Sequence, residues 1–142
     1  MTLVLTFLRA TPSLNDFANR YRHAPWQYRD TRRLWHRLVS DALVEARVAS
    51  LASLDWPRPP QDRVTVQVTR YAPAHQWLDP DNLSGGLKPV LDGLKAHAVI
   101  ANDTAKAIDL VARQEVSPHQ QPTRWTEIRL SFEAHLLREE HR

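Results

Sequence analysis

The chain of 142 residues has no cysteine, only three glycines and a single methionine. Without cysteine there are no disulfides and no thiolate ligands, so any bound metal must be held by oxygen or imidazole. No apolar run approaches the roughly 20 residues that a membrane-spanning helix needs. The opening residues MTLVLTFLRATPS lack the basic start of a signal peptide and read better as a first strand. We therefore expect a cytoplasmic protein that does not enter a membrane.

The length is that of one domain, with 42% hydrophobic residues to build its core. We expect a single domain over residues 1–142, with a charged tail over 138–142 that frays. The apolar patterns predict strands over 1–8, 63–71, 108–112 and 128–134, and helices over 28–53 and 82–97. Asp30 or Thr31 is expected to cap the first helix, whereas Pro89 delays the continuous part of the second to Leu87 or Lys88. The order β-α-β-α-β-β predicts a compact α+β fold, with two helices packed on a mixed or antiparallel sheet.

Positive charge is concentrated near the start of the chain. Seven arginines and two acids lie between residues 1 and 37, a local balance of 7 − 2 = +5 against +3 for the whole chain. Arginine forks suit phosphates and the interleaved aromatic rings suit bases, so this stretch predicts a nucleic-acid surface. The alternative is a solvated basic helix with a few anchoring rings. The arginines are Arg9, Arg20, Arg22, Arg29, Arg32, Arg33 and Arg37.

Two carboxylates, Asp79 and Asp81, are separated by Pro80. An extended backbone here points both carboxylates to one side, where a hard cation such as Mg²⁺ relieves their repulsion. A third carboxylate, Asp103, lies in a loop after the second helix, where the chain can return to the same end. The alternative is that Asp79 and Asp81 are turn and cap residues, because Asp-Pro-Asp-Asn before an apolar run is also typical of a helix start.

The run from Asp79 to Asp103 resembles the RusA family, phage and prophage endodeoxyribonucleases that resolve Holliday junctions. The matching residues are Asp79-Pro80-Asp81-Asn82, Lys88, Asp92-Gly93-Leu94 and Asn102-Asp103. A less specific match is the stretch over 11–15, which is similar to the loop that follows the first strand in the family. The sequence departs from the pattern by about three extra residues before Lys88, around Gly85-Gly86, and by Asn102 in place of an acid.

The resemblance implies a Mg²⁺-dependent endonuclease, with Mn²⁺ as a plausible substitute, that acts on branched double-stranded DNA in recombination and repair. It assigns the metal ligands to Asp79, Asp81 and Asp103 and the essential lysine to Lys88. It also implies a homodimer, which suits the two-fold symmetry of a four-way junction. Supporting roles fall to Asn82, Asp92 and Asn102. For DNA contact we expect Arg20, Arg22, Arg29, Arg32, Arg33, Asn15 and Trp77.

Two alternatives stay open. A DNA-binding module that keeps the fold without catalysis is favoured by the reduced acidic pair at Asn102-Asp103. A protein-interaction domain leaves the arginine and aromatic stretch unexplained. The seven histidines are scattered without metal-binding or nuclease spacing, so a histidine-based site is not expected.

Overall fold

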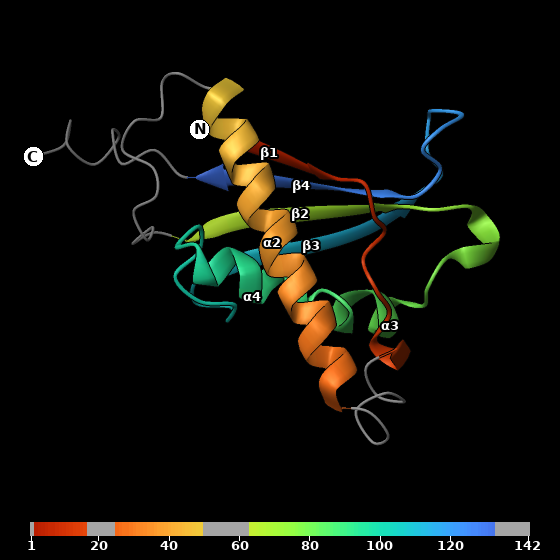
Figure 1. Ribbon diagram of the computed structural model, residues 1–142, viewed down its shortest axis with the longest axis horizontal. Helices are drawn as coiled ribbons and strands as arrows, with labels where there is room; N and C mark the ends of the chain where they lie inside the picture. Colours follow the sequence, from red (N-terminus) through yellow and green to blue (C-terminus); the bar gives the residue numbers. More distant parts are fainter. Residues whose placement is uncertain (1, 17–24, 50–62, 133–142) are drawn as a thin grey trace, which may run out of the picture.

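The computed structural model describes residues 2–16, 25–49 and 63–132 (Figure 1). Four strands, three helices and one short 3-10 helix lie wholly within these ranges, and a short helical stretch over 14–16 ends the first of them. They are β1 (Thr2–Phe7), α2 (Pro25–Ala49), β2 (Val64–Tyr71), η1 (Ala74–Gln76), α3 (Pro80–Gly85), α4 (Lys88–Ala96), β3 (Ile108–Glu115) and β4 (Trp125–Phe132). None of the helices in these ranges is long and apolar enough to cross a membrane.

The strands form one sheet in the order β1-β4-β2-β3. β4 runs antiparallel to both of its neighbours, whereas β2 and β3 are parallel. The parallel connection between β2 and β3 is long enough to hold α3 and α4, as such crossovers require. The α+β fold with a mixed sheet, predicted from the sequence, is confirmed.

The helices cover one face of the sheet, with α2 crossing it obliquely and α4 lying beside α2 (Figure 1). Alternate residues of the central strands point toward these helices, as the period of a strand dictates. Val66 and Val68 of β2 and Leu130 of β4 are fully buried there, and Val39 of α2 packs against them in the same core. The opposite face of the sheet carries the polar half of each alternation and is more exposed.

α2 begins at Pro25, five residues before the earliest cap that the sequence suggests. The prediction that Asp30 or Thr31 caps this helix is therefore wrong. Proline is well tolerated in a first helical turn because its missing N–H has no partner there, which explains the earlier start. The predicted end near residue 53 lies outside the described residues. The predicted strand over 108–112 is too short, because β3 extends to Glu115. The predicted strand over 128–134 starts too late, because β4 begins at Trp125.

The second predicted helix is divided in two. α3 ends at Gly85 and α4 begins at Lys88, so the expected start of the continuous helix is confirmed, but the segment before it is a separate short helix. Close packing explains the glycines at this break. A Cβ on Gly86 would lie 1.8 Å from the carbonyl oxygen of Pro12, and one on Gly85 would lie 2.8 Å from the Leu14 side chain. The glycines thus allow the segment over 11–16 to lie directly on α3.

Candidate functional site

Asp79 is the N-cap of α3, and its carboxylate is held by one neighbour. Its Oδ1 accepts a hydrogen bond from the backbone N–H of Asn82 at 2.9 Å, and its Oδ2 accepts one from the Asn82 side-chain amide at 2.8 Å. The backbone N–H of Asn82, followed by its side-chain amide, lowers the pKa of Asp79 below the ordinary value of 3.8. Asp79 is therefore ionised at neutral pH, as a capping or metal-binding carboxylate must be.

Asp81 lies in the first turn of α3 and is exposed. Because α3 begins at Pro80, the backbone between the two aspartates turns into a helix. Asp79 itself is extended, with φ −66° and ψ 163°, as expected before a proline, but the expectation that the extended backbone continues through Asp81 is wrong. The alternative, a helix cap at Asp79, is confirmed. An acidic residue in the first turn also interacts favourably with the helix dipole.

Asn82 connects α3 to the segment that follows β1. Its side-chain oxygen accepts a hydrogen bond from the backbone N–H of Asn15 at 3.0 Å. The same segment is tied down at Thr11, whose carbonyl oxygen accepts from Arg70 Nε at 2.9 Å. Asn15, which the sequence assigns to DNA contact, thus lies beside the acidic motif although the two are 67 residues apart.

Lys88, at the start of α4, contacts two carboxylates. Its Nζ lies 3.5 Å from Asp92 Oδ1, one helical turn away, and 3.9 Å from Asp103 Oδ2 in the loop before β3. Asp92 in turn lies 3.9 Å from Nε of Arg32 on α2. Alternating charges therefore run from α2 across α4 to the loop. The contact of Lys88 with Asp92 confirms the prediction that the two share a helix face, and the structure adds Asp103 to them. Asn102 lies next to Asp103, and its side chain accepts a hydrogen bond from the Asp103 N–H at 2.9 Å.

The donor set matches a hard divalent cation by its chemistry, because Asp79, Asp81 and Asp103 offer carboxylate oxygens that are at least partly exposed. Within residues 2–16, 25–49 and 63–132, however, no group of three or more acids or histidines is arranged to hold a metal ion. In this arrangement Asp79 is engaged by Asn82, and Asp103 by Lys88. The assignment of the three aspartates as metal ligands stays a prediction.

Three of the predicted DNA-contacting arginines line a hollow of about 430 Å³ on α2. Arg29, Arg32 and Arg33 share it with His36, and the spacing of three, four and seven residues puts all four on one helix face. Burial and the charge of Arg32 lower the pKa of His36 below 6.5, against a smaller opposing effect of Asp92. The hollow therefore derives its positive charge from the arginines. Arg20 and Arg22 lie outside the described residues.

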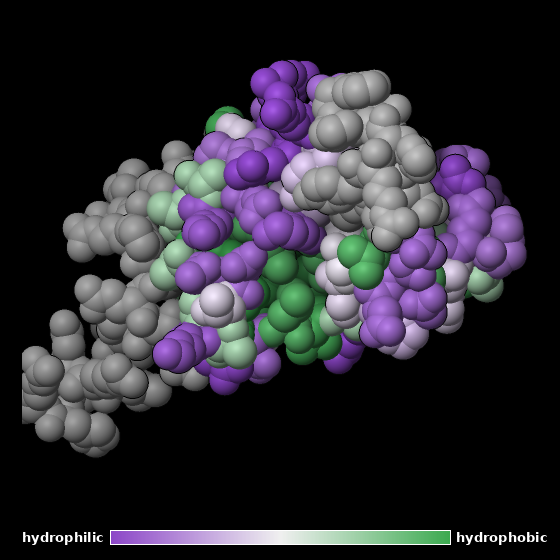
Figure 2. Space-filling model, turned by 90° about the horizontal axis from the view of Figure 1, so that it is seen from below, coloured by the Kyte–Doolittle hydropathy of each residue, from purple (hydrophilic) through white to green (hydrophobic). Residues whose placement is uncertain are grey.

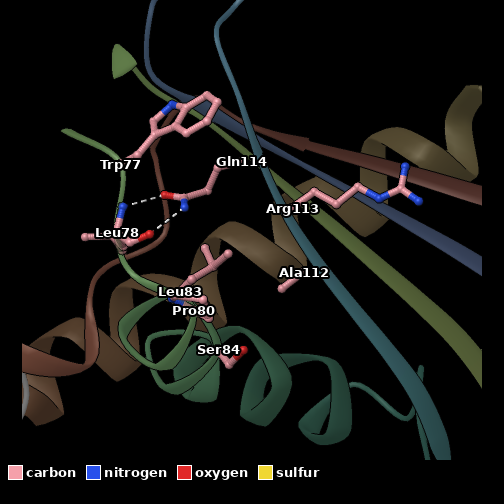
Figure 3. Close-up of a pocket in the computed structure, with 8 residues that line it drawn as sticks. All are labelled: Trp77, Leu78, Pro80, Leu83, Ser84, Ala112, Arg113 and Gln114. Carbon is pink, nitrogen blue, oxygen red and sulfur yellow. Dashed lines mark hydrogen bonds between the residues drawn. The ribbon is translucent and has the colours of Figure 1, made fainter. Parts of the chain in front are cut away.

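Trp77 borders a second pocket of about 300 Å³, shown in Figure 3. Its indole N–H donates to the Ala72 carbonyl at 3.0 Å, and the residue remains 45% exposed. Gln114 of β3 fixes the adjoining segment, since its side chain accepts from the Leu78 N–H and donates to the Leu78 carbonyl, both at 2.7 Å. The apolar alternation did not indicate this role, because it ends at Ala112 whereas β3 extends to Glu115.

No protein-family model matches the chain, and no curated protein matches it.

Proposed function

We propose that the chain is a Mg²⁺-dependent endodeoxyribonuclease that cuts branched DNA. The observation that carries the proposal is the meeting of Lys88 with Asp92 and Asp103, because these residues belong to the part of the sequence that resembles the RusA pattern. A cation beside carboxylates at a helix start is a suitable arrangement for stabilising a phosphate on which negative charge develops. The substrate proposed is the four-way junction, and the reaction is the hydrolysis of phosphodiester bonds in recombination and repair.

The residues of the motif receive distinct roles. Asp79, Asp81 and Asp103 would hold Mg²⁺, or Mn²⁺ in its place, and the bound ion would polarise a phosphoryl oxygen and lower the pKa of the attacking water. Lys88 stabilises charge on the phosphate or orients Asp103, with which it is paired. Asn82 orients Asp79 through its two hydrogen bonds, and Asp92 holds Lys88 on the side facing the loop.

The arginine hollow is proposed to bind the DNA backbone. Arg29, Arg32 and Arg33 present guanidinium groups on one face, and Arg32 is linked to the lysine and acids through Asp92. A phosphate held in the hollow would therefore lie on the α2 side of these residues. Guanidinium forks bind phosphate oxygens in pairs, which gives orientation as well as affinity. Asn15, which is hydrogen-bonded to Asn82 of α3, and Trp77, which shares a pocket with Leu83 of α3, are proposed to add further DNA contacts.

Paired nicks in a two-fold symmetric junction require two active sites related by a two-fold axis, so we propose a homodimer. We propose that the protein acts in the cytoplasm on branched DNA of a phage or of its host.

The second candidate is a branched-DNA-binding module without catalysis. It is favoured by the arrangement of the carboxylates, since within the described ranges no three of them form a metal-binding group. In this alternative Lys88 and the arginines bind phosphates, and Asp79 acts only as a helix cap. Binding without cleavage distinguishes this candidate from the nuclease.

The test compares Asp81→Asn, Asp103→Asn and Lys88→Ala with Asp41→Asn, which changes an exposed carboxylate on α2 outside the motif. We expect the three motif variants to bind the junction as the unchanged protein does, yet to lose at least about a hundredfold in cleavage rate. Asp41→Asn should retain cleavage. Full cleavage by Asp81→Asn would overturn the assignment of the acidic site.

A further inference from the structure

We propose that the outer edge of β3 is a self-complementary surface, through which two copies of this chain pair their sheets in antiparallel register. The inference deepens the proposed homodimer by naming its surface, although the argument depends only on the strand itself. β3 lies at one end of the sheet and pairs with β2 alone among the described strands. An exposed edge strand presents unpaired backbone groups that readily bind another strand.

The backbone groups of β3 alternate between β2 and the outer edge. The carbonyl oxygens of Ala107 and Glu115 accept hydrogen bonds from the β2 side, from the N–H groups of Val64 and Ala72. The backbone N–H and C=O groups of the odd-numbered residues of β3 therefore point toward β2. Those of the even-numbered residues Leu110 and Ala112 point away from the sheet. A two-fold axis at Val111 makes Leu110 of each copy face Ala112 of the other, and such a pair exchanges both N–H···O bonds.

The same register matches the charges. With Val111 opposite itself, Asp109 of each copy faces Arg113 of the other. Both residues are exposed on the sheet face away from the helices, and Asp109 has a side-chain exposure of 60%. Opposite charges directly across an antiparallel pair are stabilising. Among the described residues of one copy, Asp109 forms a loose ion pair with Arg63 at 3.9 Å, and such an exposed pair contributes little to stability.

Apolar side chains continue this match on the other face. Leu110 and Ala112 pack against the core but remain partly exposed. Figure 2 views the molecule from below, the side on which β3 lies in Figure 1, and shows apolar side chains gathered in the middle of that face between hydrophilic ones. Pairing across the axis brings the Leu110 and Ala112 side chains of the two copies together and removes their exposed parts from water.

The pairing also has a consequence for the site. In this register Ile108 of one copy faces Gln114 of the other, and Gln114 holds the segment at Leu78 that leads into Asp79. The loop with Asp103 ends just before Ile108. The loop with Asp103 of one copy therefore approaches the segment that leads into Asp79 of the other copy. The two-fold axis produces this arrangement twice in the dimer.

The first test uses the natural absence of cysteine. In a residue pair without hydrogen bonds, the Cα atoms are about 4.5 Å apart, which is within the range for a disulfide. We expect Val111→Cys to form a covalent dimer under mild oxidation at micromolar concentration. The matched control is Val4→Cys, an exposed valine on β1, the other edge strand, which should remain monomeric on a denaturing gel. Equal cross-linking of both variants, or of neither, would overturn the proposed surface.

The second test exchanges the charges. Asp109→Arg and Arg113→Asp should each weaken the dimer about tenfold or more in sedimentation equilibrium, because two attractive pairs become repulsive. The double variant should restore the original dimer constant. A dimer unaffected by the single changes, or not restored in the folded double variant, would contradict the register.

The experiments distinguish an error in the proposed dimer surface from an error in the proposed nuclease activity. Junction cleavage by a protein that does not cross-link at position 111 refutes the surface alone. Efficient cross-linking in a protein that cleaves no junction refutes the nuclease alone.

Discussion

Replacing Gly86 by alanine tests how the segment over 11–16 is held on α3. The glycine has a φ of −72°, which any residue adopts, so backbone strain has no part in the effect. A Cβ at this position would lie 1.8 Å from the Pro12 carbonyl oxygen and 2.7 Å from its carbonyl carbon. These atoms belong to backbone, so relief requires the segment itself to move by more than about 1 Å.

That movement strains the two hydrogen bonds that anchor the segment, from Arg70 to the Thr11 carbonyl and from the Asn15 N–H to Asn82. Overpacking costs about 1–3 kcal/mol, and each weakened hydrogen bond adds about 1 kcal/mol. The gain in helix propensity from alanine offsets about 0.5–1 kcal/mol. We therefore expect Gly86→Ala to lower the free energy of unfolding by about 2–4 kcal/mol.

The assay is urea unfolding, in which the midpoint should fall while the slope stays unchanged. Gly85→Ala is the matched comparison, because its Cβ would lie 2.8 Å from side-chain atoms of Leu14, a smaller overlap than the 1.8 Å approach to the backbone of Pro12 at Gly86. Gly85→Ala should lose less stability than Gly86→Ala, by at least about 1 kcal/mol. Equal stability of the two variants would refute the account of close packing at Gly86.

Three further results are expected. Gln114→Leu should cost about 1–3 kcal/mol and change the fluorescence of Trp77, because both hydrogen bonds to Leu78 are lost; an unchanged urea midpoint would count against this role. Because the pKa of Asp79 is lowered in the folded protein, its carboxylate stabilises the fold above pH 3.8, and this stability is lost as the pH falls through the lower pKa of the folded state. Asp79→Asn should therefore weaken the dependence of the free energy of unfolding on pH below 3.8, and an unchanged dependence would contradict this role. The lowered pKa of His36 means that the unfolded chain binds more protons, so stability should fall as the pH drops below 6.5; His36→Gln should remove that slope, and an unaltered slope would contradict it.

Local patterns in the sequence were sufficient for most of the fold. The alternation of Val64, Val66 and Val68 predicts a half-buried strand, and these residues are buried in β2. Helix boundaries were less accurate, because Pro25 is compatible with a first turn but does not by itself identify one. The motif at Asp79 had two interpretations, an extended pair and a helix cap, and only the three-dimensional context of α3 decides for the cap.

Contacts between distant segments were beyond the sequence patterns. Nothing local to Asn15 indicates its hydrogen bond with Asn82, and nothing local to Gln114 indicates that it holds Leu78. Both contacts depend on how the loops return over the sheet. The approach of Asp103 to Lys88 was likewise not predicted from the sequence, which placed Asp103 with Asp79 and Asp81. The metal-binding and catalytic roles of these residues stay predictions, as do the DNA contacts.

The most direct test of the nuclease is cleavage of an end-labelled synthetic four-way junction, beside a linear duplex of matched sequence, in Mg²⁺, Mn²⁺ or EDTA. The account predicts paired nicks in the junction with either metal, no cleavage in EDTA or of the duplex, and none by Asp81→Asn. Junction binding without cleavage in either metal would contradict it and favour the non-catalytic module. Cleavage that persists in EDTA or in Asp81→Asn would contradict the acidic metal site itself.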